Sequence, residues 1–442
     1  MDISKKIYYY SEDAMRRGGG HQSEDAIKKR IVDSVFVAYG AAKAEPVMIA
    51  KAALLPSKGK YNSRIYFSKK EASVDVAAFI NGTMTRYLDY NDTYLSKEAL
   101  HPSDNIPSIL CCADAMGMEG KRAINAISIS YQISCALSDA ASIRSRGWDH
   151  VVYISISAAA GISALMSLGQ EAFINALSLS IDSNISMRQT RVGKLSMWKG
   201  CTAGNAARNS IFATILAKNG LTGPEPIFEG EMGLFNQVSG KFKLDLSKSR
   251  ITKTMIKNYP VEYHAMSAVD AALKLRRRIK GEIRSITVET FLTAYNIIVK
   301  GPEKLKPKTK ETADHSMPYI IAYTLLHGAP TQRSYTRSLL NDREMASLVD
   351  KMEFVVSKKY NSLYPEYLPV RISITTSEGR FSEEVLFPKG HFKDPYGWSD
   401  LKHKGMSIIP DESLVDDLIA LGKRLDRKSV HELFELMSNV NT

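Results

Sequence analysis

The 442-residue sequence contains little cysteine, and its cysteines form no Cys-x-x-Cys pair. The four thiols belong to Cys111, Cys112, Cys135 and Cys201. They lie among apolar or small residues, which favours buried thiols in a reducing compartment. Zinc sites and iron–sulfur clusters need cysteine ligands at suitable spacing, so we expect no metal site.

Long apolar runs are absent as well. No stretch of eighteen apolar residues occurs, and the N-terminal segment "MDISKKIYYYSEDAMRRGGG" lacks the apolar core and small-residue cleavage site of a secretory signal. The sequence therefore predicts a cytoplasmic protein without a membrane partner. Its length exceeds what one hydrophobic core usually fills, and with 44% hydrophobic residues it predicts two globular domains.

Acidic residues are fewer than basic ones, 47 against 59, and the net charge of +12 favours anionic partners. Basic residues cluster in two segments, 274–280 (KLRRRIK) and 299–312 (VKGPEKLKPKTKET). Neither segment has interleaved aromatic residues or belongs to a recognisable nucleic-acid-binding module. We interpret the two clusters as a solvated helix face and a mobile loop, and nucleic acid is not an expected partner.

The chain up to residue 264 has the pattern of helices. Ser23, followed by acids and by apolar residues at helical spacing, predicts an amphipathic helix with Ser23 as its N-cap. Inner helices of a large bundle are expected where Ala, Ser, Ile and Leu combine with few charges, at 122–142, 152–168, 171–183 and 203–219.

The pattern changes after residue 265. Polar and apolar residues alternate in "RSITVET" (284–290) and in "VRISITTSEGRFSEEVLF" (370–387), which predicts a strand and a β-hairpin, and "KMEFVVSKKY" is a further candidate strand. Helical spacing returns near the C-terminus, with caps at Asp411 or Ser413 and at Ser429. The predicted fold is mainly α: a large all-helical domain at 1–264, to which 400–442 returns, and a smaller α+β lid domain at 265–399.

One polar stretch, "LDYNDTYLSKEALHPSDN" (88–105), sets Asp89, Asp92 and Asp104 beside His101. Pro102 disfavours helix at His101, and the residues after it are typical of a helix start. The imidazole is therefore expected beside a helix N-terminus, which suits a carboxylate or phosphate and lowers the pKa of a nearby histidine. A capped surface turn is the alternative interpretation of these residues.

Several blocks together resemble the MmgE/PrpD family. They are "NGTMTRYLDYNDTYLSKEALHPSDN", "GWDHVV", "SMRQTRVGKLSMWKGCTAGNAARNSIFATILAKNGLTGP", "FEGEMGLF", "KNYPVEYHAMSAVDAALKL" and, less closely, "DHSMPY". They follow the order of the family from about residue 81 to 275, and the "LDYNDT…HPSDN" form is most similar to its 2-methylcitrate dehydratase branch.

The resemblance implies a helical domain built from the N- and C-terminal parts of the chain, with an α+β lid domain between them. It also implies a homodimer that acts on a small tricarboxylate without any cofactor. The implied reaction is elimination of water from 2-methylcitrate to give 2-methyl-cis-aconitate, a hydro-lyase step of propionate catabolism. Decarboxylation of cis-aconitate and epimerisation of iminodisuccinate are the alternatives within the family.

The family motifs also imply site residues. They carry over onto five catalytic candidates, Asp89, His101, His150, Lys199 and His264, and onto five substrate-binding candidates, Arg86, Arg188, Arg191, Lys257 and Tyr319. No metal ligand is implied. Where other members have a histidine two residues after the "YP" proline, this chain has Glu262, so the acid–base role stays open between Glu262 and His264.

Each candidate has a structural alternative. His150 could cap or pack at a helix start, and Lys199 could be a surface lysine. Arg188 and Arg191, three residues apart, could form surface ion pairs instead of clamping a carboxylate. Tyr319 could be a core tyrosine, and we interpret His315 as structural.

The mechanism expected from these residues has His101, oriented by Asp89, exchanging the substrate proton or assisting the hydroxyl. His264 or His150 supplies the complementary group, and the cations neutralise a tricarboxylate. Outside enzymes, the rival hypothesis is a basic scaffold or nucleic-acid-binding protein.

Overall fold

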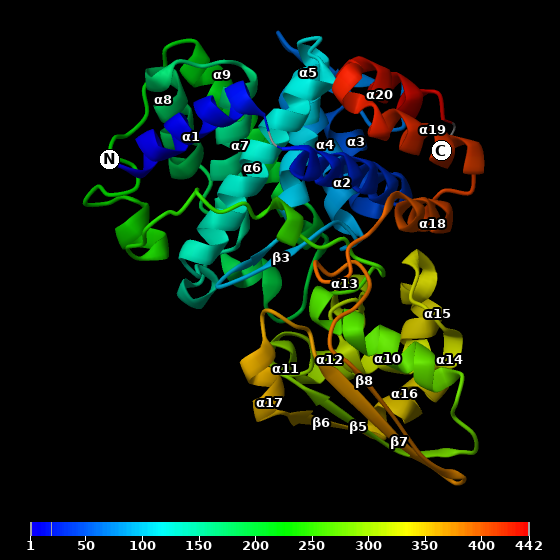
Figure 1. Cartoon of the computed structure of the whole chain (residues 1–442). Helices are drawn as coiled ribbons and strands as arrows, with labels where there is room; N and C mark the ends of the chain where they lie inside the picture. The colour runs from blue at the N-terminus through cyan, green and yellow to red at the C-terminus, as the bar shows by residue number, and fades with distance from the viewer. Residues whose placement is uncertain (1, 19, 441–442) are drawn as a thin grey trace.

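Helices dominate the N-terminal part and the C-terminal end of the chain in the computed structural model, which describes residues 2–18 and 20–440 (Figure 1). With 58% of residues in helices and 10% in strands, the structure confirms the expected large helical domain and smaller α+β domain. Within the described residues, no helix combines the length and the apolar character that a membrane span requires.

The helical domain is built from long helices and two small β-ribbons. The α-helices before the α+β domain are α1 (Ile3–Arg17), α2 (His21–Gly40), α3 (Glu45–Leu54), α4 (Val74–Tyr87), α5 (Ile106–Ala115), α6 (Gly120–Ala140), α7 (Val151–Leu165), α8 (Gln170–Asp182) and α9 (Thr202–Lys218). The ribbons are β1 (Asn62–Arg64) with β2 (Glu71–Ser73), and β3 (Tyr94–Leu95) with β4 (Ala99–Leu100). The stretches expected as inner helices correspond to α6 to α9, which confirms that prediction.

Short helical turns connect these helices. The 3-10 turns are η1 (Pro102–Asn105), η2 (Arg144–Arg146), η3 (Arg188–Arg191), η4 (Met197–Gly200), η6 (Ile251–Lys253) and η7 (Tyr263–Ala265), and η5 (Phe235–Ser239) is a π-helical turn. Most of the polar residues discussed below lie on or next to these turns.

Two glycines let α4 and α9 approach closely. A β-carbon on Gly82 would lie 2.7 Å from the Cα atom of Gly204 on α9, so neither position has room for a side chain. This contact places the C-terminal end of α4 beside the turn η4 that precedes α9. The two segments bring Asp89 and Lys199 together.

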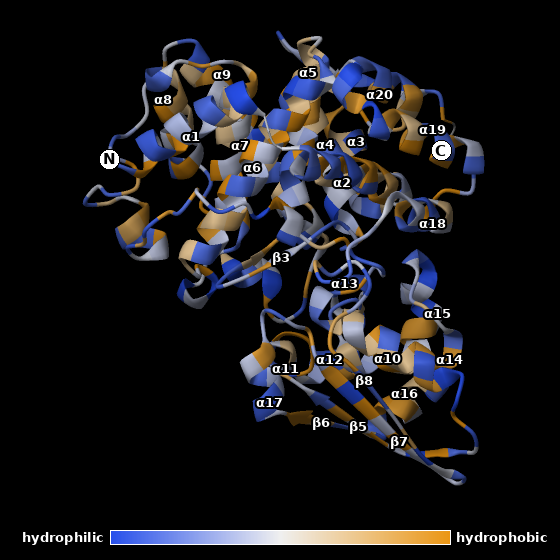
Figure 2. Cartoon of the chain, in the orientation of Figure 1, coloured by the Kyte–Doolittle hydropathy of each residue, from blue (hydrophilic) through white to orange (hydrophobic). Residues whose placement is uncertain are grey.

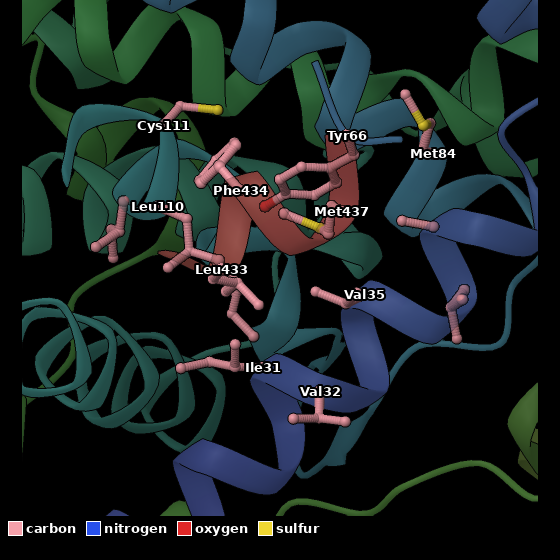
Figure 3. Close-up of a cluster of buried hydrophobic side chains, with 14 of the residues drawn as sticks. Ile31, Val32, Val35, Tyr66, Met84, Leu110, Cys111, Leu433, Phe434 and Met437 are labelled. Atoms are coloured by element: carbon pink, nitrogen blue, oxygen red, sulfur yellow. The ribbon is translucent and has the colours of Figure 1, made fainter. Parts of the chain in front are cut away.

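The C-terminal helices pack against the helices of the first domain. They are α18 (Trp398–Ile408), α19 (Glu412–Lys423) and α20 (Val430–Ser438), with the 3-10 turn η9 (Leu425–Arg427) between the last two. Figure 3 shows Phe434 and Met437 of α20 near Tyr66 and Val35 in one buried cluster. Burying each such side chain contributes about 1.5–3 kcal/mol, which anchors the chain end to the first domain.

Helix caps confirm two predictions and correct a third. Asp411 accepts from the backbone N–H of Leu414, and Ser429 forms a capping box with Glu432. Ser23 is not an N-cap, because α2 begins at His21 and places Ser23 inside its first turn.

The α+β domain is a four-stranded sheet with helices packed on one face (Figure 1). The strands, in spatial order, are β6 (Met352–Val356), β5 (Ile283–Thr290), β7 (Val370–Thr376) and β8 (Gly379–Val385). The helices and turns are α10 (Met266–Arg276), α11 (Leu292–Ile298), α12 (Pro302–Leu305), α13 (Lys310–Ala313), α14 (Met317–His327), η8 (Gln332–Tyr335), α15 (Arg337–Leu340), α16 (Arg343–Asp350) and α17 (Lys358–Leu363).

The sheet confirms the strands expected from alternation. β5 pairs with β6 in parallel, whereas β5–β7 and β7–β8 are antiparallel. Apolar and polar residues alternate along β7 (Figure 2), and Val370, Ile372 and Ile374 are buried under the helices. The predicted hairpin is present, with Thr376 paired to Gly379 across its turn.

The two basic segments differ in structure. In 274–280, Lys274 and Arg278 form ion pairs with Glu383, as a solvated helix face does. The segment 299–312, expected to be a mobile loop, instead folds into α12 and α13, and it buries Lys304. That expectation is therefore wrong for this segment.

Candidate active site

A cavity between the two domains collects most of the predicted site residues. We call it the interdomain cavity. From the helical domain it is lined by Arg86, Asp89, Thr93, Leu95, Glu98, Ala99, His101, Arg144, His150, Arg188 and Arg191. From residue 257 onward it is lined by Lys257, Glu262, Tyr263, His264, Ile297, Lys304 and His315.

A larger cavity lies beside Tyr90 and Asn258, next to the segments that carry Asp89 and Lys257. Its two lysines are neutralised within the protein. Lys404 pairs with Asp33 at 2.6 Å, and Lys389 pairs with acidic neighbours as well. We place the chemistry in the interdomain cavity, because that is where histidines and unpaired cations meet.

Asp89 stands at the centre of the charged residues in the interdomain cavity. Its φ of +53° is in the left-handed region, which a residue with a side chain adopts at an energetic cost and which is common at functional sites. Its Oδ1 accepts hydrogen bonds from Arg86 Nη1 at 2.9 Å and from Lys257 Nζ at 2.6 Å. Burial opposes ionisation, but the charges of Arg86, Lys257 and Lys199 outweigh it and hold the pKa of Asp89 well below its usual value.

Lys199 links Asp89 to the α+β domain. Its ammonium lies 3.2 Å from Asp89 Oδ2 and 3.1 Å from Asp314 Oδ1. Burial lowers the pKa of Lys199 to about 8, although both carboxylates favour its charged form. Lys199 is buried behind Asp89 and does not line the interdomain cavity among the described residues.

The two carboxylates that Lys199 contacts, together with His315, have the spacing of a metal site. Ligand atoms of Asp89, Asp314 and His315 lie within 4.8 Å of one another. The Lys199 ammonium already lies between the two carboxylates, and it would repel a metal ion placed there. The donor set therefore fits a buried lysine better than a metal.

His101 is held by hydrogen bonds at both ring nitrogens. Nδ1 lies 2.7 Å from the carbonyl oxygen of Asp92, and Nε2 lies 3.0 Å from Arg86 Nη2. A carbonyl oxygen only accepts, so Nδ1 carries the proton and Nε2 presents its lone pair. Burial, reinforced by the charges of Arg86 and Lys257, lowers the pKa of His101 well below its usual value. The Asp92 carbonyl therefore orients His101 directly, whereas Asp89, expected in that role, is linked to His101 through Arg86.

His150, at the start of α7, faces His101 with ring centroids 5.5 Å apart and an interplanar angle of 65°. Its Nδ1 lies 3.0 Å from Asp149 Oδ1, and its Nε2 lies 3.8 Å from Asp104 Oδ2. Burial disfavours the charged imidazole, but Asp149 and Asp104 outweigh it and raise the pKa of His150. The two facing histidines thus have pKa values shifted in opposite directions.

Glu262 and His264 act as a pair. Glu262 Oε1 lies 2.7 Å from His264 Nδ1, and Glu262 also accepts from the His264 backbone N–H. His264 Nε2 lies 3.2 Å from the Tyr364 hydroxyl. Burial opposes ionisation of Glu262, but the charge of His264 outweighs it and lowers the pKa of Glu262 to about 2. Both nitrogens of His264 thus have protein partners, which leaves it less available to a substrate than His150.

The two predicted clamp arginines have different partners. Arg191 Nε donates to Asp149 Oδ2 at 2.9 Å, and its Nη2 donates to Thr202. In the part of the chain that the structure describes, the guanidinium of Arg188 makes no ion pair with a carboxylate. Arg188 is therefore the arginine of this pair that is free to bind a substrate carboxylate.

Tyr319 does not reach the interdomain cavity. It lies in the core of the α+β domain and borders a different hollow near Leu339 and Arg343. Its hydroxyl donates to the carbonyl oxygen of Ser334 at 2.6 Å. The structure therefore places Tyr319 in a packing role and brings the other nine predicted residues together in or beside the cavity.

The sequence interpretation missed several residues of the site. His315, taken as structural, lines the cavity, with Nε2 3.4 Å from Asp89 Oδ2 and Nδ1 2.6 Å from Asp314 Oδ1. The block "DHSMPY" contained the signal, because Asp314 and His315 are its first two residues. Arg144 and Lys304 also line the cavity, and the sequence around them carried no comparable signal.

Two family models match the chain. The MmgE/PrpD N-terminal domain model matches residues 19–247, and the MmgE/PrpD C-terminal domain model matches residues 259–412.

Similar proteins carry related names. Over 345 residues the chain is 30% identical to "2-methylcitrate dehydratase, mitochondrial" of Yarrowia lipolytica, a match that covers 71% of this chain and 66% of that protein. It is 28% identical to 2-methylcitrate dehydratase of Escherichia coli K12, covering 71% of each chain. An alkylcitrate dehydratase of a fungal species is 27% identical over 72% of this chain and 69% of its own length.

Proposed function

We propose a function from one premise: the chain belongs to the MmgE/PrpD family, whose two domain models match most of its length. The proposed activity is that of a hydro-lyase that eliminates water from 2-methylcitrate and yields 2-methyl-cis-aconitate, as in propionate catabolism. The relatives named above support this substrate class, since they are named for dehydration of 2-methylcitrate or of an alkylcitrate.

The observation that carries the proposal is the pair formed by His101 and His150. Elimination of water needs a base for the carbon-bound proton and an acid for the departing hydroxyl. A lowered pKa favours the neutral form of His101, which can accept a proton, and a raised pKa favours the protonated form of His150, which can donate one. The two facing rings are therefore shifted in the directions that a base and an acid in one cavity require.

In the proposed reaction, His101 Nε2 takes the proton from the carbon next to a substrate carboxylate. The C–H electron pair forms the new double bond as the C–O bond breaks, and His150 Nε2–H gives its proton to the hydroxyl, which leaves as water. In the free protein, Nε2 of His101 accepts a hydrogen bond from Arg86. A substrate carboxylate that draws Arg86 toward itself would free this lone pair.

Cations around the cavity support the negative charge of the reaction. Proton removal next to a carboxylate spreads charge onto the carboxylate oxygens, and preorganised cations stabilise that charge without reorganisation. Arg86 and Lys257 line the cavity but share Asp89 as their counter-ion. Arg188 is not neutralised by such a pair among the described residues, which supports a role in holding a substrate carboxylate.

A substrate panel tests the proposal. The purified protein is incubated with 2-methylcitrate, citrate, cis-aconitate and iminodisuccinate, while alkene absorbance and carbon dioxide are followed. We expect alkene formation from 2-methylcitrate at the highest rate. Carbon dioxide released from cis-aconitate, or epimerised iminodisuccinate, with no alkene from 2-methylcitrate, would replace the dehydratase by one of the family's other reactions.

Three further expectations come with the proposal. Activity should survive chelators and air, since no metal or other cofactor enters the proposed reaction. The family resemblance supports a homodimer in the cytoplasm, which light scattering and cell fractionation would test. A scaffold or nucleic-acid-binding role would instead show retention on RNA or DNA that weakens steeply with salt.

A further inference from the structure

Lys304 is a buried cation without a carboxylate partner. It lies on the short helix α12 of the α+β domain, is 7% exposed and lines the interdomain cavity. Its ammonium makes no hydrogen bond and no ion pair with any residue in the ranges 2–18 and 20–440. An ammonium that lines a cavity without a protein partner is available to an anion bound in that cavity.

Two of the three acids whose charges act on Lys304, Asp314 and Glu262, are already engaged, and Glu303, its neighbour in the chain, forms no ion pair with it. Asp314 binds Lys199 and Lys310, and Glu262 binds His264. Burial lowers the pKa of Lys304, while the charges of Glu303, Asp314 and Glu262 oppose that shift. These carboxylates attract the ammonium from a distance without satisfying its hydrogen bonds.

Two arginines of the helical domain share this condition. Arg144 and Arg188 line the same cavity and, within the described chain, neither forms an ion pair with a carboxylate. Burial lowers the pKa of Arg188, the charges of Glu98 and Asp149 oppose that shift, and the nearby Arg144 adds to the lowering. Like charges held together in this way are relieved when an anion binds between them.

The cations of the interdomain cavity therefore fall into two groups. Arg86, Lys257 and Arg191 are neutralised by Asp89 or Asp149. Arg144, Arg188 and Lys304 are not, and we call these three the open cations. A tricarboxylate also has three carboxylates, one for each open cation. Arg144 and Arg188 belong to the helical domain, and Lys304 belongs to the α+β domain.

We propose that Lys304 binds one carboxylate of the substrate and that, with Arg144 and Arg188, it selects tricarboxylates over dicarboxylates. This inference rests on the proposed function for its substrate class. It adds a specificity residue from the α+β domain to a reaction whose acid and base come from the helical domain. An ammonium suits this role, because it is a compact charge with rotatable donors and makes no demand for a planar, bidentate partner.

The test measures binding, with a matched pair of ligands. Propane-1,2,3-tricarboxylate and glutarate share a five-carbon chain with carboxylates at both ends, and glutarate lacks the central carboxylate. Calorimetry at one ionic strength compares both ligands on the unaltered protein, on Lys304→Met and on Lys306→Met. Lys306 is the control, because it is exposed and removing it changes the net charge equally.

We expect Lys304→Met to weaken tricarboxylate binding by about 10–100-fold, as loss of a charge-assisted hydrogen bond does. Glutarate binding should change by less than about threefold, and Lys306→Met should change neither ligand. The melting temperature of ligand-free Lys304→Met should stay the same or rise, because an unpaired buried charge is removed. Lys304→Arg, which keeps the charge, should retain the preference for the tricarboxylate.

Three results would overturn the inference: unchanged tricarboxylate binding by Lys304→Met, an equal loss for both ligands, or a lower melting temperature with the preference intact in the folded variant. Neither probe carries a hydroxyl, so binding is independent of dehydration. A protein that prefers the tricarboxylate through Lys304 but releases no alkene from 2-methylcitrate would refute the proposed activity alone.

Discussion

The interdomain cavity has two unlike walls. The wall from the helical domain carries two facing histidines with oppositely shifted pKa values and a carboxylate shared by several cations. The wall from residue 257 onward carries His264, which is paired with the Glu262 carboxylate and the Tyr364 hydroxyl, and Lys304, whose ammonium has no partner in the described chain. The difference suggests that one wall performs proton transfer and the other selects the substrate.

Packing explains why the groups proposed for proton transfer lie on the helical wall. Their pKa shifts depend on complete burial and on charges held within about 4 Å, which requires a rigid frame. The glycine contact between α4 and α9 supplies such a frame next to Asp89. If the two walls have these separate roles, substitutions on the helical wall should lower kcat or stability, and substitutions on the other wall should act mainly through substrate affinity.

The largest effect is expected from His101→Gln. Glutamine keeps a hydrogen-bonding side chain but cannot transfer the proton, so kcat should fall by about 10²–10⁴-fold with little change in melting temperature. The exposed His327 provides the control, and His327→Gln should leave turnover unchanged. Turnover is measured as steady-state alkene formation. Near-normal turnover of His101→Gln would show that another residue transfers the proton and that the two walls do not have the proposed separate roles.

Asp89→Asn should act first on stability. The substitution removes the shared counter-ion of Arg86, Lys199 and Lys257, and leaving buried charges uncompensated costs about 3–5 kcal/mol. Urea unfolding measures this loss, with Asp182→Asn at an exposed helix end expected to stay within about 0.5 kcal/mol. Under conditions where the variant is folded, its turnover should fall less than that of His101→Gln. Unchanged stability would show that the three cations do not depend on Asp89.

The pH profile of kcat/KM tests the two histidines together. His101, with its lowered pKa, stays a base until the pH falls well below 6.5, and His150, with its raised pKa, stays an acid until the pH rises above 6.5. We expect a plateau that spans pH 6.5, with limbs that fall about tenfold per pH unit on either side. His150→Gln should remove the alkaline limb and keep the acid one. An acid limb that begins near pH 6.5 would contradict the assignment of His101 as the base.

The smallest effect is expected from His264→Gln, on the second wall. Because the proposed base and acid are His101 and His150, and His264 is paired with Glu262 and Tyr364, the substitution should lower kcat by no more than about tenfold. Tyr364→Phe, which removes the hydroxyl next to Nε2, should have a similarly small effect. A loss of more than about a hundredfold in kcat for His264→Gln would assign proton transfer to both walls.

Features that depend on near neighbours in the chain were predictable from the sequence. The inner helices α6 to α9, the β7–β8 hairpin and the caps at Asp411 and Ser429 follow from periodicity, turn residues and capping chemistry. Pro102 and the polar residues after it likewise placed His101 in an extended conformation before a helical turn. These features hold because the responsible interactions lie within a few residues of one another.

Only the tertiary structure decided which charges neutralise one another. Lys199 and Asp314 are 115 residues apart in the chain, yet they share a hydrogen bond that joins the two domains. Some cations thus pair with protein carboxylates, whereas Lys304 has no such partner in the described chain. This difference cannot be read from the composition or from residue spacing. Tyr319 shows the opposite outcome: its sequence motif predicted a site residue, but helix α14 places its side chain in the core. Ion pairing and pKa depend on burial and on charges brought together by packing, so neither could be derived before the two domains were placed side by side.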